Sequence, residues 1–350
     1  MIDLVLVELP NPALESPRMY QPLGILYLSA VAKQAGYSVQ IADFRNGKGG
    51  IPKANFYGFS CTTPEINFAK QLAKEVKGRT IVGGAHPSLL PEDCIDDFDY
   101  VVVGEGEEAL INIMGGKYES GIVKTSRIKN LDSIPYPDWN AVTDPFSETL
   151  YAGERYGRGI KSMSIITSRG CPFKCAYCGN LFLTPTVFRS VDNIIGELKT
   201  LKEQGIKYFR FVDDNFTLHP DFDSLCLKMV MLGIHYRCHT RSDLLTEMQA
   251  TLLNRSGCEE CSLGVESADA KVLKLNRKHI TVKQHAQAIA ILKKAGLKVK
   301  VYLMAGLPGE TDETNRLNKE FITSNKPEKW TLSTFTPYPG CDIYKNPGKY

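Results

Sequence analysis

The stretch that decides the fold is Gly170-Cys171-Pro-Phe-Lys-Cys175-Ala-Tyr-Cys178, which directly follows the apolar run Met163-Ser-Ile-Ile-Thr167. The apolar run predicts a short buried strand, and the loop after it carries three thiols at close spacing. Soft thiolates at such spacing are typical ligands of iron–sulfur clusters. A cubane cluster needs four ligands, so three cysteines leave one iron open to a substrate or cofactor.

Two other interpretations of these cysteines are open. A structural zinc ion is normally closed by a fourth Cys or His at short spacing. Here the next histidine along the chain is His219, far beyond the loop. A zinc knuckle, or three thiols that are simply buried, are the alternatives to a cluster.

The bulk composition restricts the class of protein. A chain of 350 residues is too long for one small core and indicates two domains. Apolar residues make up 43% of it, and no unbroken apolar run approaches the roughly 20 residues of a membrane span. The start of the chain lacks a basic leader and a cleavage site, so we expect a cytoplasmic protein. Its ten cysteines are therefore expected to be thiols or metal ligands. A net charge of +3 without a dense Lys/Arg tract does not indicate a nucleic-acid partner.

In the first part of the chain, residues 1–127, short apolar strands alternate with helical segments. This pattern predicts a doubly wound, Rossmann-like parallel sheet, which binds ligands at the carboxyl edge of its strands. The run between Asp43 and Asn55 is too short and too rich in glycine for a full crossover helix, so the domain looks trimmed there. Proline-rich residues 128–160 predict a linker. The predicted strands are Leu4–Leu9, Tyr37–Ala42, Phe56–Ser60, Thr80–Val82 and Tyr100–Val103.

The second part, residues 161–350, again alternates strands with helices. Six such units predict a partial (β/α)6 barrel, in which the chemistry lies at the carboxyl ends of the strands. The predicted strands are Met163–Thr167, Tyr208–Val212, Tyr236–Thr240, Cys261–Val265, Lys298–Met304 and Trp330–Thr336.

The spacing C-x-x-x-C-x-x-C, with the aromatic Tyr177 before the last cysteine, resembles the signature of the radical S-adenosylmethionine (SAM) superfamily. The resemblance implies a 4Fe–4S cluster on Cys171, Cys175 and Cys178, with SAM chelated to the open iron. It also implies reductive cleavage of SAM to a 5′-deoxyadenosyl radical, with an electron donor such as flavodoxin or ferredoxin.

The later strand ends extend the resemblance over residues 161–340. It implies SAM contacts by the Tyr177 backbone at the adenine, by Arg241 at the carboxylate, where its planar fork suits the ligand, and by Glu266 at the ribose. Each of these residues also has an alternative interpretation as a helix cap, a turn residue or a surface charge. The other implied SAM residues are Asp213, Asp214, Ser267, Gly306, Pro308 and Gly309.

Glycine loops follow two strands of the first part, at Gly83-Gly84-Ala-His86 and at Gly104-Glu105. Glycine lets the backbone approach a large ligand closely. Together with Gly24, these loops resemble the cobalamin-binding domain that precedes the barrel in one class of radical SAM enzymes. One departure is Arg45, which stands where other cobalamin modules carry a cobalt-binding histidine; the other is the trimmed crossover. The alternatives are a vestigial domain that only covers the barrel and, for His86, a hydrogen bond within its loop.

The resemblance implies methyl transfer from cobalamin to an unactivated carbon, with a second SAM re-methylating the cobalt. The first alternative is a radical SAM rearrangement, epimerisation, cyclisation or oxidation without methyl transfer. An alternative from another class is a metal-stabilised binding protein without catalysis. A second cluster on Cys258 and Cys261 is an alternative to two buried core cysteines. The substrate is not predictable from the sequence, and a protein partner is a further possibility because little chain follows the sixth strand.

Overall fold

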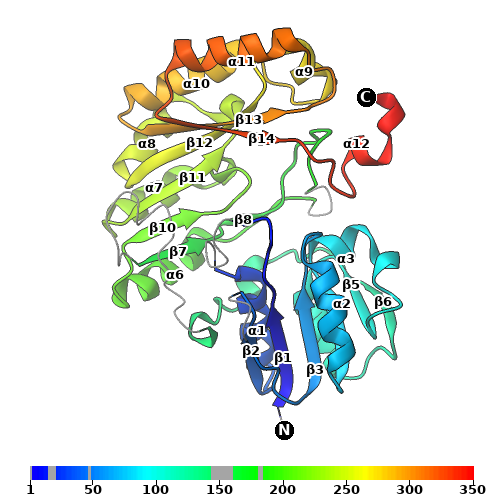
Figure 1. Ribbon diagram of the computed structural model, residues 1–350. Helices are drawn as coiled ribbons and strands as arrows, with labels where there is room; N and C mark the ends of the chain where they lie inside the picture. The colour runs from blue at the N-terminus through cyan, green and yellow to red at the C-terminus, as the bar shows by residue number, and fades with distance from the viewer. Residues whose placement is uncertain (1, 15–20, 46–48, 143–160, 180–183) are drawn as a thin grey trace. The chain divides into compact units, whose positions relative to one another are not determined.

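The computed structural model describes residues 2–14, 21–45, 49–142, 161–179 and 184–350. The chain divides into two compact units, Met1–Lys161 and Ser162–Tyr350, coloured blue to green and green to red in Figure 1. Among the described residues, no helix is long and apolar enough to cross a membrane.

The first unit is built on a parallel sheet with the strand order β2-β1-β3-β4-β5-β6. The order reverses between β1 and β3, which makes the sheet doubly wound and confirms the predicted fold class. The sequence analysis missed β6, because this edge strand has only four residues and one fully buried side chain, Val123. The strands are β1 (Ile2–Glu8), β2 (Val39–Asp43), β3 (Ala54–Ser60), β4 (Arg79–Gly83), β5 (Tyr100–Val103) and β6 (Gly121–Lys124).

Helices cover both faces of this sheet. Because successive side chains of a strand point to opposite faces, β1 serves two cores. Leu4 and Leu6 pack with α1 and α4, whereas Val5 and Val7 pack with α2. The helices are α1 (Leu23–Gln34), α2 (Ile66–Glu75), α3 (Ala85–Leu89) and α4 (Gly106–Met114).

The connection from β2 to β3 has no helix among its described residues, 44–45 and 49–53. A pocket of about 900 Å³ opens beside it, lined by Ile51, Tyr57 and Leu72. The short crossover therefore leaves a hollow against α2 where a full crossover helix would pack.

The described part of the predicted linker packs onto the first unit. Leu131 and Trp139 are buried there. Asp138 accepts a hydrogen bond from Ser29 Oγ at 2.6 Å and forms an ion pair with Lys33 at 2.6 Å. Residues 128–142 therefore belong to the core of the first unit, while residues 143–160 lie outside the described part of the chain.

The second unit contains a parallel sheet in which every strand lies beside its neighbour in the chain, in the order β7-β10-β11-β12-β13-β14 (Figure 1). This is the order of a β/α barrel, and it confirms the predicted partial barrel. The strands are β7 (Ser162–Ile165), β10 (Tyr208–Phe211), β11 (His235–Thr240), β12 (Cys258–Glu266), β13 (Lys298–Ala305) and β14 (Lys329–Thr334). The helices are α6 (Val191–Glu203), α7 (Phe222–Val230), α8 (Glu247–Arg255), α9 (Ala270–Leu275), α10 (Val282–Lys294), α11 (Asp312–Asn325) and α12 (Asp342–Lys345).

A two-stranded antiparallel ribbon, not predicted from the sequence, encloses the cysteine loop. β8 (Ser168–Arg169) pairs with β9 (Val187–Phe188), and the three cysteines lie between them in the chain. Arg189, just after β9, forms a buried ion pair with Glu197 at 2.6 Å. The ribbon anchors both ends of the loop to the barrel.

Candidate cluster and cofactor site

The cysteine loop is held from two directions. The backbone N–H of Ala176 donates to the carbonyl of Asn276, after α9, at 2.9 Å. The carbonyl of Ala176 accepts from the N–H of Ile343 in α12 at 3.2 Å, and Ala176 packs against Cys341. The C-terminal helix therefore fixes the loop that carries the sulfur atoms.

Polar donors approach the sulfur atoms of Cys171 and Cys175. Asn215 Nδ2 lies 3.2 Å from Cys171 Sγ, and Arg241 Nη1 lies 3.6 Å from Cys175 Sγ. Burial raises the pKa of the Cys171 thiol. A nearby guanidinium opposes that effect and favours the thiolate, which is the form that binds metal.

The spacing of the three sulfur atoms is wider than in the one compact group of candidate ligands among the described residues. Among the described residues, only His86, Asp93 and Cys94 form a group of three or more candidate ligands whose atoms all lie within 4.8 Å of one another. At least one pair of sulfurs in the cysteine loop is therefore farther apart. Three thiolates on one zinc ion, with Zn–S bonds of about 2.3 Å, would lie about 4 Å apart. The three sulfur atoms, as placed here, are not as close together as they would be on a single zinc ion.

The second cysteine group lies in the core. Cys238, Cys258 and Cys261 are buried on β11 and β12, with 3.9 Å between the sulfurs of Cys238 and Cys258. Burial raises the pKa of the Cys258 thiol. These residues do not form a metal-binding group by the same distance criterion, so the structure favours core thiols over a second cluster.

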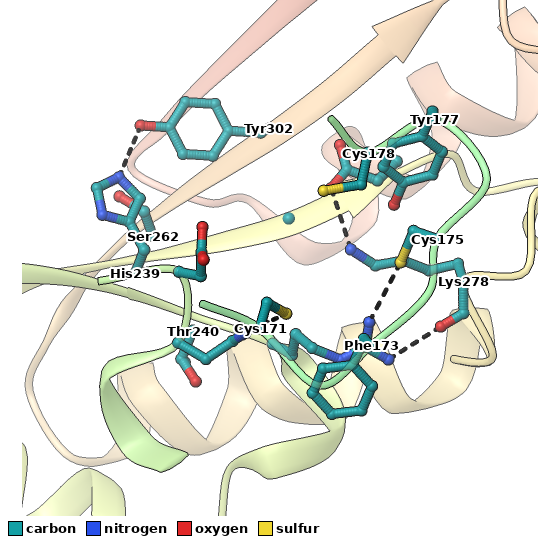
Figure 2. A pocket seen from close by; sticks show the side chains of 15 residues that line it. Cys171, Phe173, Cys175, Tyr177, Cys178, His239, Thr240, Ser262, Lys278 and Tyr302 are labelled. Atoms are coloured by element: carbon teal, nitrogen blue, oxygen red, sulfur yellow. Dashed lines mark hydrogen bonds and ion pairs between the residues drawn. The ribbon is translucent and has the colours of Figure 1, made fainter. Parts of the chain in front are cut away.

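A pocket of about 220 Å³ lies beside the cysteine loop, at the carboxyl ends of the barrel strands. Figure 2 shows His239 and Tyr302 on one side of it and Cys175, Tyr177 and Cys178 on the other. The lining residues are Cys171, Phe173, Cys175, Tyr177, Cys178, Asp214, Asn215, His239, Thr240, Arg241, Ser262, Gly264, Glu266, Lys278 and Tyr302.

A buried ion pair forms part of the wall. Lys278 Nζ lies 3.0 Å from Glu266 Oε1, and both side chains are largely buried. Glu266 has a φ of +66°, a backbone conformation that residues other than glycine rarely adopt. A Cβ on Gly264 would lie 2.5 Å from Glu266 Oε1, so a larger residue there would displace this carboxylate. The ion pair therefore places a carboxylate in the wall of the pocket.

Arg241 is already engaged on several sides. Its guanidinium bonds Asp243 at 3.0 and 3.1 Å, donates to the carbonyl of Lys278 at 2.9 Å, and lies 3.7 Å from the centre of the Phe173 ring. This arrangement ties the cysteine loop to β11 and to the segment after α9.

Four of the predicted SAM residues line the pocket, namely Tyr177, Asp214, Arg241 and Glu266. Asp213 lies behind the wall, where its Oδ1 accepts four hydrogen bonds from Thr167 and Ser168. Ser267 is buried and accepts from the N–H of Asp269 at 3.2 Å. Gly306, Pro308 and Gly309 form the turn after β13 and do not line the pocket.

The sequence analysis missed Phe173, Lys278, His239, Ser262 and Tyr302. Strand alternation could have found His239, Ser262 and Tyr302. His239 pairs with Ser262, and Gly264 pairs with Tyr302, so all of these residues lie on one face of the sheet. Lys278 follows α9, away from any strand end, and only the tertiary fold returns it to the pocket.

The glycine loops of the first unit lie at one edge of its sheet, at the carboxyl ends of β3, β4 and β5. A Cβ on Gly84, whose φ is +101°, would lie 2.8 Å from the carbonyl oxygen of Cys61. A Cβ on Gly104 would lie 2.5 Å from Thr125 Oγ1, so both positions require glycine. Gly24 faces the same edge, with Ser60 Oγ 3.8 Å from its would-be Cβ, and Gly83 ends β4.

The polar residues at this edge are held by the protein itself. Both ring nitrogens of His86 are occupied, Nδ1 by Thr63 Oγ1 at 3.2 Å and Nε2 by Asp93 Oδ2 at 3.0 Å. Glu105 is buried, pairs with Arg127 and accepts from the N–H of Ile128 at 2.6 Å. These side chains therefore order the loops, and His86 offers no spare nitrogen in this arrangement.

Arg45 makes a bidentate pair with Asp43, at 2.9 and 2.7 Å. A guanidinium has no lone pair available for a metal. The position of the usual cobalt-binding histidine is thus filled by a residue that does not ligate.

Comparison with known proteins decides the family. A family model described as the radical SAM superfamily matches residues 165–320, and one described as a B12 binding domain matches residues 13–114. An uncharacterized methyltransferase from Pyrococcus horikoshii is 30% identical over 93% of this chain and 78% of its own length. This chain belongs to the radical SAM superfamily, in the class that carries a B12-binding domain.

Other relatives and solved structures agree with the fold. The bacteriochlorophyllide d C-12(1)-methyltransferase of Chlorobaculum tepidum is 27% identical to this radical SAM protein, over 95% of this chain and 74% of its own. The radical SAM methyltransferase TsrM from Kitasatospora setae, solved with cobalamin and a 4Fe–4S cluster, has a TM-score of 0.77 at 16% identity. It aligns with 98% of this chain and 74% of its own.

The cofactors of this radical SAM protein are therefore a 4Fe–4S cluster, SAM and cobalamin. Its residues fit the first two, because soft thiolates, an approaching guanidinium and a pocket with a buried carboxylate lie together. They also fit the third, since the edge of the first sheet keeps two close-packed glycine turns where a Cβ would intrude.

Proposed function

We propose that this protein transfers a methyl group from cobalamin to a carbon atom of its substrate, with SAM cleaved at the cluster. When bound, the reduced cluster and SAM would supply the radical that removes hydrogen from carbon, and cobalamin would supply the methyl group. The observation that carries the proposal is that one chain holds both a pocket lined by the three cysteines, in its second unit, and a B12-binding sheet with glycine turns at one edge, in its first. Several relatives are named as methyltransferases, which supports the proposal.

The chain's own residues have separate tasks in this proposal. Cys171, Cys175 and Cys178 bind the cluster. Glu266 faces the ribose of SAM, and its buried partner Lys278 becomes available to the carboxylate of SAM when Glu266 turns to the sugar. Arg241 holds the cysteine loop, because its guanidinium is already shared by Asp243 and the carbonyl of Lys278.

Cobalamin in this protein is proposed to receive no histidine from the edge of the first sheet. Arg45 occupies the usual position and is bound to Asp43, and His86 uses both ring nitrogens within its own loop. The glycines at positions 24, 83, 84 and 104 then serve as backbone surface for the ligand.

The superfamily needs a reductant, and we propose a flavodoxin or a ferredoxin as its source. None of the ten cysteines forms a disulfide, and a reducing cytoplasm would keep them unpaired with one another.

The decisive experiment uses protein reconstituted anaerobically with iron, sulfide and cobalamin, and SAM that carries a deuterated methyl group. We expect 5′-deoxyadenosine, S-adenosylhomocysteine, and a labelled methyl group in a product of cell extract detected by mass spectrometry. The Cys175→Ala variant is the matched control and should give none of the three. Release of 5′-deoxyadenosine by a protein that retains no cobalamin would refute methyl transfer.

The same experiment separates the alternatives. A rearrangement, epimerisation, cyclisation or oxidation would give 5′-deoxyadenosine without S-adenosylhomocysteine and without label in the product. A binding protein without catalysis would give neither nucleoside, even with a full complement of iron and sulfide.

A further inference from the structure

A buried amide stands beside the first cysteine of the loop. Asn215 follows β10 and the aspartates Asp213 and Asp214, and it is only 5% exposed. Its Nδ2 lies 3.2 Å from Cys171 Sγ, which is hydrogen-bond distance for a nitrogen donor and a sulfur acceptor. Because the two residues are far apart in the chain, this contact exists only in the folded barrel.

The segment that carries this amide is tightly packed. The carbonyl of Asn215 accepts from the N–H of Leu218 at 3.1 Å. Phe216 is fully buried, and its ring centre lies 4.6 Å from that of Phe211 in β10. On the other side in the chain, Asp213 bonds to the residues that precede the cysteine loop. The amide is therefore presented to the sulfur from a well-fixed backbone, as groups that support a metal ligand usually are.

The second atom of the amide indicates which group faces the sulfur. Asn215 Oδ1 is buried and has no hydrogen-bond partner among the described residues. If the amide were turned round, a thiol on Cys171 could donate to Oδ1, whereas a thiolate bound to iron has no proton to donate. The orientation seen, with Nδ2 toward the sulfur, therefore suits a metal-bound thiolate better than a free thiol.

A second donor reaches another sulfur of the loop. Arg241 Nη1 lies 3.6 Å from Cys175 Sγ, and Asp243 holds the same guanidinium at 3.0 and 3.1 Å. Asp243 offsets the charge of Arg241, so what reaches Cys175 is chiefly a hydrogen bond. The carboxylate of Asp214, which lines the pocket, acts in the opposite direction because it disfavours negative charge at Cys171.

Donors to the sulfur ligands change the energy of reduction. One-electron reduction of a cluster adds a negative charge, which is shared with the sulfur atoms that bind it. A hydrogen bond to a sulfur is stronger when that sulfur carries more charge, so it stabilises the reduced cluster and raises its reduction potential. Removal of such a bond should make the cluster harder to reduce.

We propose that Asn215 raises the reduction potential of the 4Fe–4S cluster, because its amide donates to the sulfur of Cys171. Asn215 is a positioning residue, since it acts through Cys171. The electron comes from the reductant, a flavodoxin or a ferredoxin, and the cluster gains one negative charge. This inference rests on the proposed binding of the cluster by Cys171 and does not depend on methyl transfer.

The test is a reductive titration of the anaerobically reconstituted protein without SAM or substrate, followed by the electron paramagnetic resonance signal of the reduced cluster. Asn215→Leu removes the donor and keeps a side chain of similar shape. We expect the ratio of reduced to oxidised cluster at a fixed potential to fall about tenfold, which equals a midpoint lower by about 59 mV for a one-electron couple. Asn215→Ala removes the donor without adding apolar bulk and should shift the midpoint in the same direction.

The matched control is Asn276→Leu. Asn276 is also a buried asparagine beside the cysteine loop, but its amide donates to the carbonyls of Val272 and Pro308, each at 2.9 Å. Its loss should lower the melting temperature and leave the midpoint potential unchanged. The inference is overturned if both Asn215 variants keep the wild-type midpoint, or if Asn215→Leu and Asn276→Leu shift it equally.

A contact with SAM is the competing role for this residue, because Asn215 also lines the pocket. Equilibrium binding of SAM to the oxidised, cluster-loaded protein separates the two roles. If Asn215→Leu weakens SAM binding but keeps the midpoint, Asn215 is a SAM residue and the inference is overturned. A lower midpoint, measured in the absence of SAM, supports the inference whether or not SAM binding changes.

Iron and sulfide analysis of Cys171→Ala distinguishes this inference from the proposed function. If that variant still holds a full 4Fe–4S cluster, the proposed ligand set is wrong and the inference falls with it. If Cys171→Ala loses the cluster but the Asn215 variants keep the wild-type midpoint, only the inference is wrong. Failure to form a methylated product would refute methyl transfer and leave the measured midpoints as they stand.

Discussion

Asp213 offers the sharpest test of how this site is built. The resemblance implies that it contacts SAM, whereas the structure shows it bonded to the residues that precede the cysteine loop. Its Oδ1 accepts from the N–H and hydroxyl of Thr167, at 2.9 and 2.8 Å, and from those of Ser168, at 2.6 and 2.7 Å. These two residues lead into the cysteine loop. We therefore predict that the Asp213→Ala substitution loosens the cluster loop rather than the contact with SAM.

The magnitude follows from the four donors. Two of them are buried backbone N–H groups that no longer have this acceptor, and each unsatisfied group costs about 1–3 kcal/mol. The two hydroxyls can rotate to other acceptors, which reduces the loss. Burial raises the pKa of Asp213, so removing its carboxylate also removes the cost of burying a charge. The net loss in the free energy of unfolding should be about 2–4 kcal/mol, or roughly 5–15 °C in the melting temperature of the second unit.

The assay compares Asp213→Ala, Asp213→Asn and Asp214→Ala by thermal unfolding, iron and sulfide content, and equilibrium SAM binding. Asp213→Asn keeps an acceptor oxygen and should retain most of the stability and the cluster. Asp214→Ala changes the adjacent pocket residue and should weaken SAM binding with little loss of stability. The reasoning is refuted if Asp213→Ala keeps its melting temperature and cluster but loses SAM binding.

Three further predictions concern other parts of the chain. Lys278→Met leaves Glu266 buried without its cation, so we expect the free energy of unfolding to fall by about 3–5 kcal/mol. Adding Glu266→Gln to this variant should restore its melting temperature. It should not restore SAM binding, measured by equilibrium dialysis. Gly84→Ala should lower the melting temperature and the amount of retained cobalamin more than Gly116→Ala does. Both glycines have a positive φ, but only at Gly84 would the added Cβ lie within 3 Å of backbone atoms. Equal effects of the two substitutions on both measurements would contradict this prediction. Burial raises the pKa of Glu8 from 4.5 to about 8, so the folded chain keeps a proton that the unfolded chain releases, and stability falls as pH rises from about 4.5 to about 8. Glu8→Gln should therefore raise the melting temperature more at pH 8 than at pH 5, whereas Glu119→Gln, at an exposed position, should show no such pH dependence.

Much of the fold was predictable because it depends on local periodicity. Short apolar strands such as Tyr100–Val103 and helices such as Ala270–Leu275 repeat a pattern that the sequence states directly. Strand β6 escaped prediction, since its four residues carry too little apolar signal for an edge strand. The ribbon of β8 and β9 escaped for a related reason, because two-residue strands have no period at all.

The sequence by itself determined the three cysteines and, through their spacing and the glycine loops, the resemblance to radical SAM enzymes with a B12-binding domain. Such features lie within a few residues of one another in the chain, so no folding is needed to see them. Only the tertiary structure decided which charged residues share the pocket. It brought in Lys278 from beyond α9 and turned Asp213 behind the wall. Contacts of this kind depend on strand register and on side-chain direction, and both are set by packing between segments far apart in the sequence.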